Sequence, residues 1–188
     1  MNRCKNEAVF QKTVRLINDF KTYFQRHGEK INENPSPGNK AGGITTLEDK
    51  SLGCVQKGGI APVEDVLAYG ERVKETGLSL LQAPGNDLVS SNALAASGAQ
   101  LVLFTTGRGT PFSCPVPTLK IASNGRLASF KADWIDFNAG TIAEGESREA
   151  AADRLFQYIL DVASGRVLAK SEALDKHELA IFKNGVTL

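Results

Sequence analysis

The first clear pattern of apolar side chains lies near the N-terminus. Between Glu7 and Arg26, apolar residues recur at the spacing of an α-helix, and Gly28 follows them. This periodicity predicts an amphipathic helix that ends at Gly28. Because an isolated helix of this length is marginally stable in water, its apolar side chains must be covered, and we expect some of their surface to remain exposed. The side chains expected to face the sheet of the same domain are Phe10, Ile17, Phe20 and Phe24.

Two short apolar runs mark the centre of the chain. Leu78–Gln82 and Gln100–Phe104 have the length and composition of buried strands, and Leu88–Ser97, with Gly98 just beyond it, is typical of a helix. A strand, a helix and a strand in this order indicate a βαβ unit, whose crossover is almost always right-handed. The predicted fold is therefore α/β, a three-layer Rossmann-like domain with a mainly parallel sheet and an N-terminal amphipathic helix.

Further elements follow from start and end signals along the chain. Pro62, with two acidic residues behind it, predicts a helix toward Val73, and Ser147 caps a predicted helix that stops at Gly165. Alternation in Thr118–Ser123 predicts a strand with Lys120 on the face opposite its apolar neighbours. The other expectations are a helix start at 45–50, turns at 51–59, an ambiguous short element at 134–140, a helix at 148–163 and a final strand at 179–183.

The length of 188 residues allows one substantial core. We therefore expect residues 1–30 to form a helix that packs on a domain formed by residues 31–188. The segment from residue 31 to 47 is rich in proline and glycine, which is typical of a flexible linker. It also fits a site loop, because Asn39 and Lys40 lie among glycines that allow a close approach to a ligand.

The charge and composition of the chain argue against some classes of binding partner. The 22 basic and 21 acidic residues give a net charge of +1, which argues against nucleic acid or an anionic membrane as a bulk electrostatic partner. No apolar run approaches the roughly 20 residues of a membrane span, and no signal peptide is evident, so we expect a cytoplasmic protein. Three widely spaced cysteines suggest neither a disulfide framework nor a metal knuckle.

The loop after the second central strand offers the most distinctive chemistry. Arg108 stands between two glycines and near three threonines, so that a guanidinium and hydroxyls could meet a carboxylate and its neighbouring hydroxyls. The alternative is a tight turn with a surface arginine. The glycines begin a dinucleotide fingerprint but Phe112 replaces its third glycine, which weakens a nucleotide-binding interpretation. The threonines are Thr105, Thr106 and Thr110.

Other polar residues have both a structural and a functional interpretation. Asn86 and Asp87 lie where a helix begins, which is the ordinary place of an N-cap. Lys120 lies within an apolar strand, so it is either a base with a lowered pKa or a solvated lysine on an edge strand.

Several blocks of the sequence are distinctive, namely Asn34–Cys54, Ala83–Asp87, Phe104–Phe112, Trp134–Gly140 and Gly185–Leu188. They resemble the C-terminal part of the altronate and galactarate dehydratase family. The resemblance implies a hydro-lyase that converts a sugar acid to a 2-keto-3-deoxy acid, with D-altronate as the expected substrate. It also implies Fe²⁺, or Mn²⁺ in its place, as cofactor, and N-terminal domains that this chain lacks. We expect a homo-oligomer.

The resemblance and the residue chemistry together give a candidate site. A non-catalytic substrate-binding or assembly domain is the alternative. Lys57 is a further candidate for the base, beside Lys40 and Lys120, and no metal ligand is assigned. The expected catalytic residues are Lys40, Asp87, Arg108 and Lys120, and the expected substrate-binding residues are Asn39, Asn86, Thr105, Thr106, Thr110 and Asn138.

Overall fold

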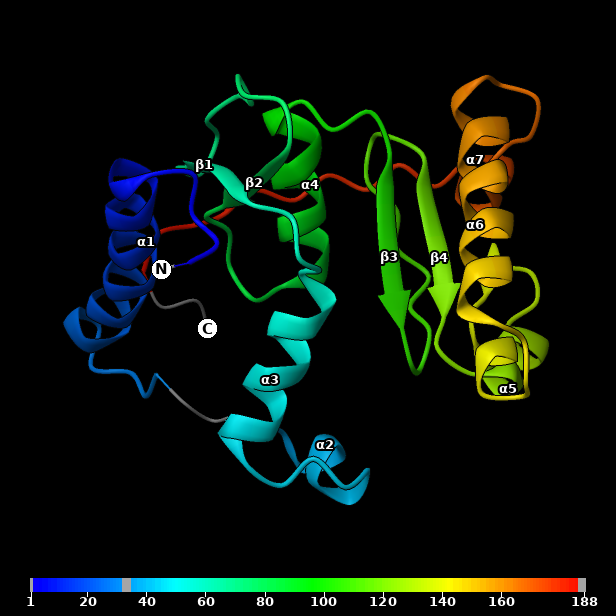
Figure 1. Cartoon of the computed structure of the whole chain (residues 1–188), viewed down its shortest axis with the longest axis horizontal. Helices are drawn as coiled ribbons and strands as arrows, with labels where there is room; N and C mark the ends of the chain where they lie inside the picture. The colour runs from blue at the N-terminus through cyan, green and yellow to red at the C-terminus, as the bar shows by residue number, and fades with distance from the viewer. Residues whose placement is uncertain (1, 32–34, 186–188) are drawn as a thin grey trace. The chain divides into compact units, whose positions relative to one another are not determined.

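The computed structural model describes residues 2–31 and 35–185 and has mixed α/β secondary structure (Figure 1). Every strand pair in it is parallel, so the predicted α/β class with mainly parallel sheets is confirmed. The chain divides into two compact units, unit 1 with residues 1–69, 73–82 and 183–188, and unit 2 with residues 70–72 and 83–182. The expected division at residue 30 stays a prediction. Asn34 and residues 186–188, which carry part of the resemblance, lie outside the described residues.

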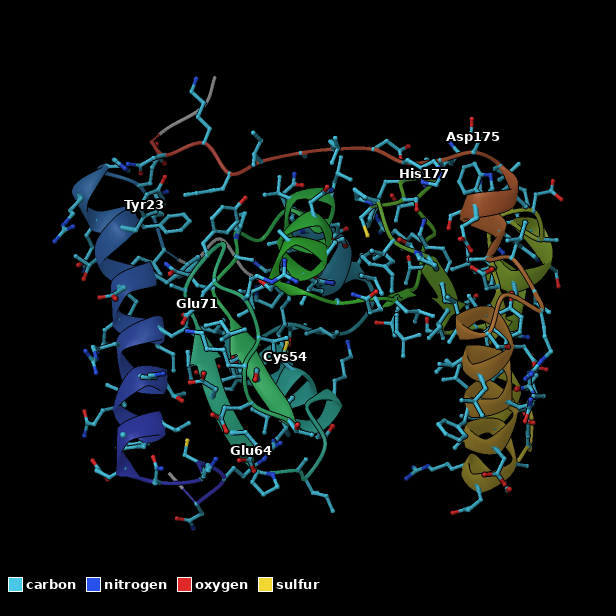
Figure 2. The ribbon with its side chains drawn as sticks, turned by 90° about the horizontal axis from the view of Figure 1, so that it is seen from above. Tyr23, Cys54, Glu64, Glu71, Asp175 and His177 are labelled. Carbon is cyan, nitrogen blue, oxygen red and sulfur yellow. The ribbon has the colours of Figure 1, made fainter. Side chains whose placement is uncertain are left out.

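Unit 1 packs a long helix against a two-stranded sheet. Strands β1 and β2 are parallel, and α1 lies beside them (Figure 1). Val9 of α1 packs on Val63 and Val66 of β1. Helices α2 and α3 have no buried residue, and Cys54 is exposed on α3 (Figure 2). The elements are α1 (Glu7–Arg26), α2 (Pro37–Ala41), α3 (Leu47–Lys57), β1 (Val63–Leu67) and β2 (Leu78–Leu81).

Helix α1 ends as predicted, but it presents a different face to the sheet. Gly28 follows the last turn with a φ of 69°, a value that favours glycine. Val9 is buried and Leu16 packs beside it, whereas Ile17 is 52% and Phe20 41% exposed. The expectation that Ile17 and Phe20 face the sheet is therefore wrong. Phe20 instead packs its ring against the next turn of α1, and exposed apolar surface remains, as expected.

Two local predictions in unit 1 are wrong. The segment after Pro62 is the strand β1, because Val63, Val66 and Leu67 are buried in the unit and this burial outweighs the helix-start signal. The segment predicted as turns lies mostly in α3, which the Thr46 side chain caps and which continues through Gly53 to Lys57. A single glycine weakens a helix but does not end it.

Unit 2 is built on a three-stranded parallel sheet with the order β3–β4–β5. The arrowheads of β3 and β4 lie at the same end of the sheet (Figure 1). All five residues of β4 are buried, and Leu119 packs against Val162 of α6 and Ala169. The elements are α4 (Asp87–Ser97), β3 (Val102–Thr106), β4 (Thr118–Ala122), α5 (Gly125–Phe130), β5 (Phe137–Asn138), a 3₁₀ turn η1 (Gly140–Ile142), α6 (Arg148–Ala163) and α7 (Lys170–Ala173).

The central βαβ unit and the final strand are not formed as predicted. Strand β2 pairs with β1 and strand β3 pairs with β4, so the strands before and after α4 belong to different sheets. Residues 179–183 form no strand within the described chain, and Leu179 and Ile181 are more than three quarters exposed. In the chain this segment comes after α7 and after Asp175 and His177, which are labelled in Figure 2. Apolar content alone does not supply the neighbouring strand that a sheet requires.

No helix within the described residues is both long enough and apolar enough to cross a membrane.

Candidate functional site

The carboxyl ends of β3, β4 and β5 meet at one edge of the sheet in unit 2. These strands end at Thr106, Ala122 and Asn138, and a glycine follows each of them within three residues. The strands are parallel, so the three loops leave the sheet on the same side. Ligands of open α/β sheets bind outside this edge, which makes it the candidate site.

Direct contacts join the three loops. Asn124 donates from Nδ2 to the carbonyl of Gly107 over 3.3 Å, and its Oδ1 accepts from the backbone of Leu127 over 2.8 Å, which caps α5. A Cβ atom added to Gly140 would lie 2.4 Å from the backbone nitrogen of Gly125. The loops after β4 and β5 therefore touch through their backbones, and glycine is required where they meet.

Side-chain groups without a partner lie at this junction and in the loop after β3. A Cβ atom added to Gly125 would lie 2.5 Å from Oε1 of Glu144 and 3.8 Å from Nδ2 of Asn138. Within the described chain, neither the Glu144 carboxylate nor the Nδ2 donor of Asn138 forms a hydrogen bond, although Asn138 Oδ1 accepts from Gly140 N, and the exposed Arg108 guanidinium forms none. A carboxylate, an amide donor and a guanidinium can bind a polyhydroxy acid.

Arg154 fastens the loop after β5. Its guanidinium pairs with the Glu146 carboxylate over 2.8 Å and also donates to the Asn138 carbonyl and the Thr141 hydroxyl. It also lies 4.3 Å from the centre of the Phe137 ring. The Arg154 and Thr141 hydrogen bonds hold the pKa of Glu146 below its usual value. These contacts fix the segment that carries Asn138 and Glu144.

Lys120 lies beneath the edge, inside β4. Only 2% of the residue is exposed, and its ammonium group donates to the carbonyls of Thr110, over 2.7 Å, and of Phe112. Burial lowers the pKa of Lys120, while the carboxylates of Asp136 and Glu178 act in the opposite direction. Asp136 also accepts from the backbone nitrogen of Lys120 over 2.7 Å.

Comparison with known proteins places the chain in a family. The sequence model described as D-galactarate/altronate dehydratase, C-terminal, matches residues 1–187. The chain belongs to this family. It is 62% identical over 189 residues to altronate dehydratase of Bacillus subtilis strain 168, and 55% identical over 188 residues to altronate dehydratase of Escherichia coli K12.

The alignments cover nearly all of this chain but a minor part of each relative. The two altronate dehydratases match 100% of the chain, which spans 38% of the length of each relative. Galactarate dehydratase (L-threo-forming) of Escherichia coli K12 is 38% identical over 183 residues, which are 96% of this chain and 35% of that relative. More than half of each of these dehydratases therefore has no counterpart in the chain.

The structure brings some of the predicted site residues to the edge. Arg108 and Asn138 lie in or beside the strand-end loops, and Thr106 accepts the backbone N–H of Gly109 with its hydroxyl over 2.9 Å. Thr105 is exposed at the end of β3, and Thr110 contributes its carbonyl to Lys120.

The remaining predicted residues have other surroundings. Asn86 caps α4 by accepting from Val89 N, and the carbonyl of Asp87 accepts from the hydroxyl of Ser91. No hydrogen bond between described residues joins these two side chains to the loops of the edge. Asn39 and Lys40 lie in α2 of unit 1, where Asn39 Oδ1 accepts from Lys50 Nζ over 3.0 Å. The functional roles of these residues stay predictions.

Sequence reasoning missed Asn124 and Glu144. Asn124 and Gly125 directly follow the predicted strand Thr118–Ser123, so this polar loop could have been included by the rule that selected Arg108. Glu144 gave no such signal, because its position depends on the close approach of Gly125 and Gly140.

The donor groups of the described residues do not fit a metal centre held by this chain alone. No three side chains of histidine, cysteine, aspartate or glutamate among them lie close enough together to hold an ion. The cofactor Fe²⁺, or Mn²⁺ in its place, stays a prediction.

Proposed function

We propose that the chain is the C-terminal part of a hydro-lyase that dehydrates a sugar acid to a 2-keto-3-deoxy acid. D-Altronate is the proposed substrate. The observation that carries this proposal is the strand-end edge, where Arg108, Asn138 and Glu144 present unpartnered groups. The identity of 62% to an altronate dehydratase supports the choice of substrate.

The groups of the edge suit the chemistry of dehydration. A base removes the proton from C2, the hydroxyl leaves C3 as water after protonation, and the resulting enol takes a proton at C3 to give the 2-keto-3-deoxy acid. In this proposal Arg108 binds the carboxylate, on which negative charge accumulates as the C2 proton leaves. Asn138 donates to a substrate hydroxyl, and Glu144 accepts from one.

The remaining roles belong to the same proposal. Lys40, Lys57 and Lys120 are the candidates for the base, and Asp87 is a further catalytic candidate. Homo-oligomerisation and a cytoplasmic location are expected of the assembled enzyme. The predicted contacts to hydroxyls come from Asn39, Asn86, Thr105, Thr106 and Thr110.

The alternative is a substrate-binding or assembly domain that needs the rest of the protein for activity. It is favoured by the coverage of 38% of the altronate dehydratases and by the absence of a metal-binding cluster among the described residues. To separate the two, 2-keto-3-deoxy acid formation from D-altronate is measured with Fe²⁺ for the chain alone. The assay is repeated after addition of the N-terminal remainder of the Bacillus subtilis relative. Product from the chain alone supports a catalytic domain, product only from the mixture supports the alternative, and no product from either contradicts both.

Arg108→Lys tests the carboxylate contact. Lysine keeps the charge but cannot form two parallel bonds to a carboxylate, so kcat/KM of the active preparation should fall by a factor equivalent to about 1.5–3 kcal/mol. Stability should change little, because the guanidinium has no partner within the described chain. The matched control is Arg148→Lys, an exposed arginine at the start of α6. Equal turnover by the two variants would contradict the proposed role of Arg108.

A further inference from the structure

Lys120, one of the candidates for the base, is a buried cation whose contacts indicate a different role. Its side chain lies on β4, and the rings of Phe104 and Phe112 lie 5.8 Å and 4.7 Å from its Nζ atom. Its hydrogen bonds within the described chain both go to backbone carbonyls, and it forms no ion pair there. A charged group that is removed from water at such cost must be compensated locally, and here the compensation comes from the segment after Arg108.

That segment is fixed at several consecutive points. The carbonyls of Thr110 and Phe112 accept from Lys120, and the backbone nitrogen of Ser113 donates to the Glu178 carboxylate over 2.8 Å. Cys114 then donates its backbone N–H to the Thr118 hydroxyl over 3.2 Å. Residues 110–114 therefore have their path set mainly by groups from β4 and from the chain after α7.

The turn that carries Arg108 lies between two anchors. On one side the Thr106 hydroxyl accepts from Gly109 N, and on the other the Lys120 ammonium holds the Thr110 carbonyl. The glycines on either side of Arg108 have wide conformational freedom, so the turn needs such anchors to keep one conformation. Loss of the ammonium would leave the carbonyls of Thr110 and Phe112 without their donor and release the turn on that side.

We propose that Lys120 is a positioning residue, which holds the Thr110–Phe112 backbone and thereby keeps the Arg108 turn in the conformation that binds the substrate carboxylate. The inference rests on the proposed function only for the identity of the ligand. The ordering of the turn by Lys120 is a property of this chain and can be measured without any substrate.

Limited proteolysis with trypsin gives the direct test, because the enzyme cleaves after arginine. In the 188-residue chain, Lys120→Met removes the donors at similar side-chain volume, and cleavage after Arg108 should accelerate by about tenfold or more relative to the other tryptic sites. The matched control is Leu119→Ala, whose fully buried side chain packs against Val162 and Ala169. The control loses stability but keeps the Lys120 bonds, so its cleavage should increase at all sites in parallel.

Parallel acceleration in Lys120→Met, or an unchanged rate after Arg108, would overturn the proposal. Should Lys120→Met not fold, Lys120→Gln, which retains a shorter donor, is compared with Leu119→Ala by the same criterion. Kinetics of the preparation that forms product separate positioning from base catalysis. Positioning predicts a raised KM with a smaller change in kcat, whereas loss of a base would lower kcat by about a hundredfold or more at an unchanged KM and overturn the proposal. A wild type that forms no product either alone or in the mixture would refute the function and leave the proteolysis result decisive for Lys120.

Discussion

A charged side chain is buried on a strand in each of the two units, and each unit compensates it differently. Asp65 on β1 pairs with Lys12 of α1 over 2.6 Å and accepts from the backbone nitrogen of Val66. Lys120 on β4 has no such counter-ion within the described chain and donates to backbone carbonyls. The ion pair joins α1 to β1, whereas the Lys120 ammonium fixes the backbone of Thr110 and Phe112. This backbone belongs to the loop that carries Arg108 at the candidate site.

The two units also differ in how tightly backbone segments pack inside each of them. At the edge of unit 2, the loops after β4 and β5 leave no space for a side chain on Gly140. In unit 1, the helix α3 has no buried residue, and a side chain on Gly53 would meet nothing within 4 Å. We therefore expect substitutions at the edge to be costly and substitutions on α3 to be tolerated.

The largest effect is expected from Gly140→Ala. The added methyl group would lie within 2.5 Å of backbone atoms of Asn124 and Gly125, which cannot rotate away as a flexible side chain would. We expect unit 2 to lose about 3 kcal/mol of stability. Urea unfolding gives the loss, and hydrogen exchange resolved by peptide should assign it to β4 and β5 rather than to α1. A urea midpoint of Gly140→Ala equal to that of the wild type would contradict the close packing of these loops.

A smaller effect is expected when the ion pair of unit 1 is removed. Asp65→Asn keeps an oxygen for the Val66 N–H but loses the attraction to Lys12, whose side chain is 45% exposed. Because solvent screens a pair with a half-exposed partner, the loss should be about 1 kcal/mol at neutral pH. The control is Lys12→Met, which should lose a similar amount, and a double variant should lose less than the sum. Additive losses would show that the pair does not contribute.

The same pair should make the stability of unit 1 sensitive to acid. The hydrogen bond from Lys12 holds the pKa of Asp65 below its usual value of 3.8 in the folded protein. The carboxylate therefore contributes stability above pH 3.8, and this contribution is lost as the pH falls through the lower folded-state pKa. The stability difference between the wild type and Asp65→Asn should shrink below about pH 4. Urea midpoints at pH 7 and pH 3 check this, and an unchanged difference would contradict it.

The sequence predicted those parts of the fold that depend on neighbouring residues. Asn86 and Ser147 cap α4 and α6, and Gly28 and Gly98 follow their helices with positive φ, as their positions in the sequence indicated. The sequence did not predict that β1 is a strand or that β2 and β3 belong to different sheets. Strand pairing is decided by burial between segments far apart in the chain, which local patterns do not record.

The candidate site shows the same limit. Arg108 was found because it lies in the loop after a predicted strand, and the carboxyl ends of parallel strands meet at one edge. Asn138, the last residue of β5, was proposed from a block of the family resemblance whose secondary structure was ambiguous. Glu144 was missed because its carboxylate reaches Gly125 only through the backbone contact of two loops. Lys120 was recognised as unusual, but its sequence neighbours could not reveal that its ammonium binds carbonyls rather than a carboxylate.

The smallest effect is expected on α3, where the comparison predicts a gain in stability. Gly53 lies inside the helix and has open space around it, so Gly53→Ala should lower the conformational entropy of the unfolded chain without a clash. We expect a stabilisation of about 0.5–1 kcal/mol for the helix. Hydrogen exchange of residues 47–57 measures it directly, because the helix packs loosely and can open on its own.

Gly59→Ala is the matched control, because it distinguishes the effect of room for a side chain from the effect of the backbone φ angle. Gly59 also has nothing within 4 Å of an added Cβ atom, but its φ is 65°, a left-handed conformation that costs an L-residue about 1–2 kcal/mol. The two substitutions should therefore have opposite signs although both positions are open. Destabilisation by Gly53→Ala would mean that α3 is packed against a further surface in solution, and the contrast between the two units would then not hold for this helix.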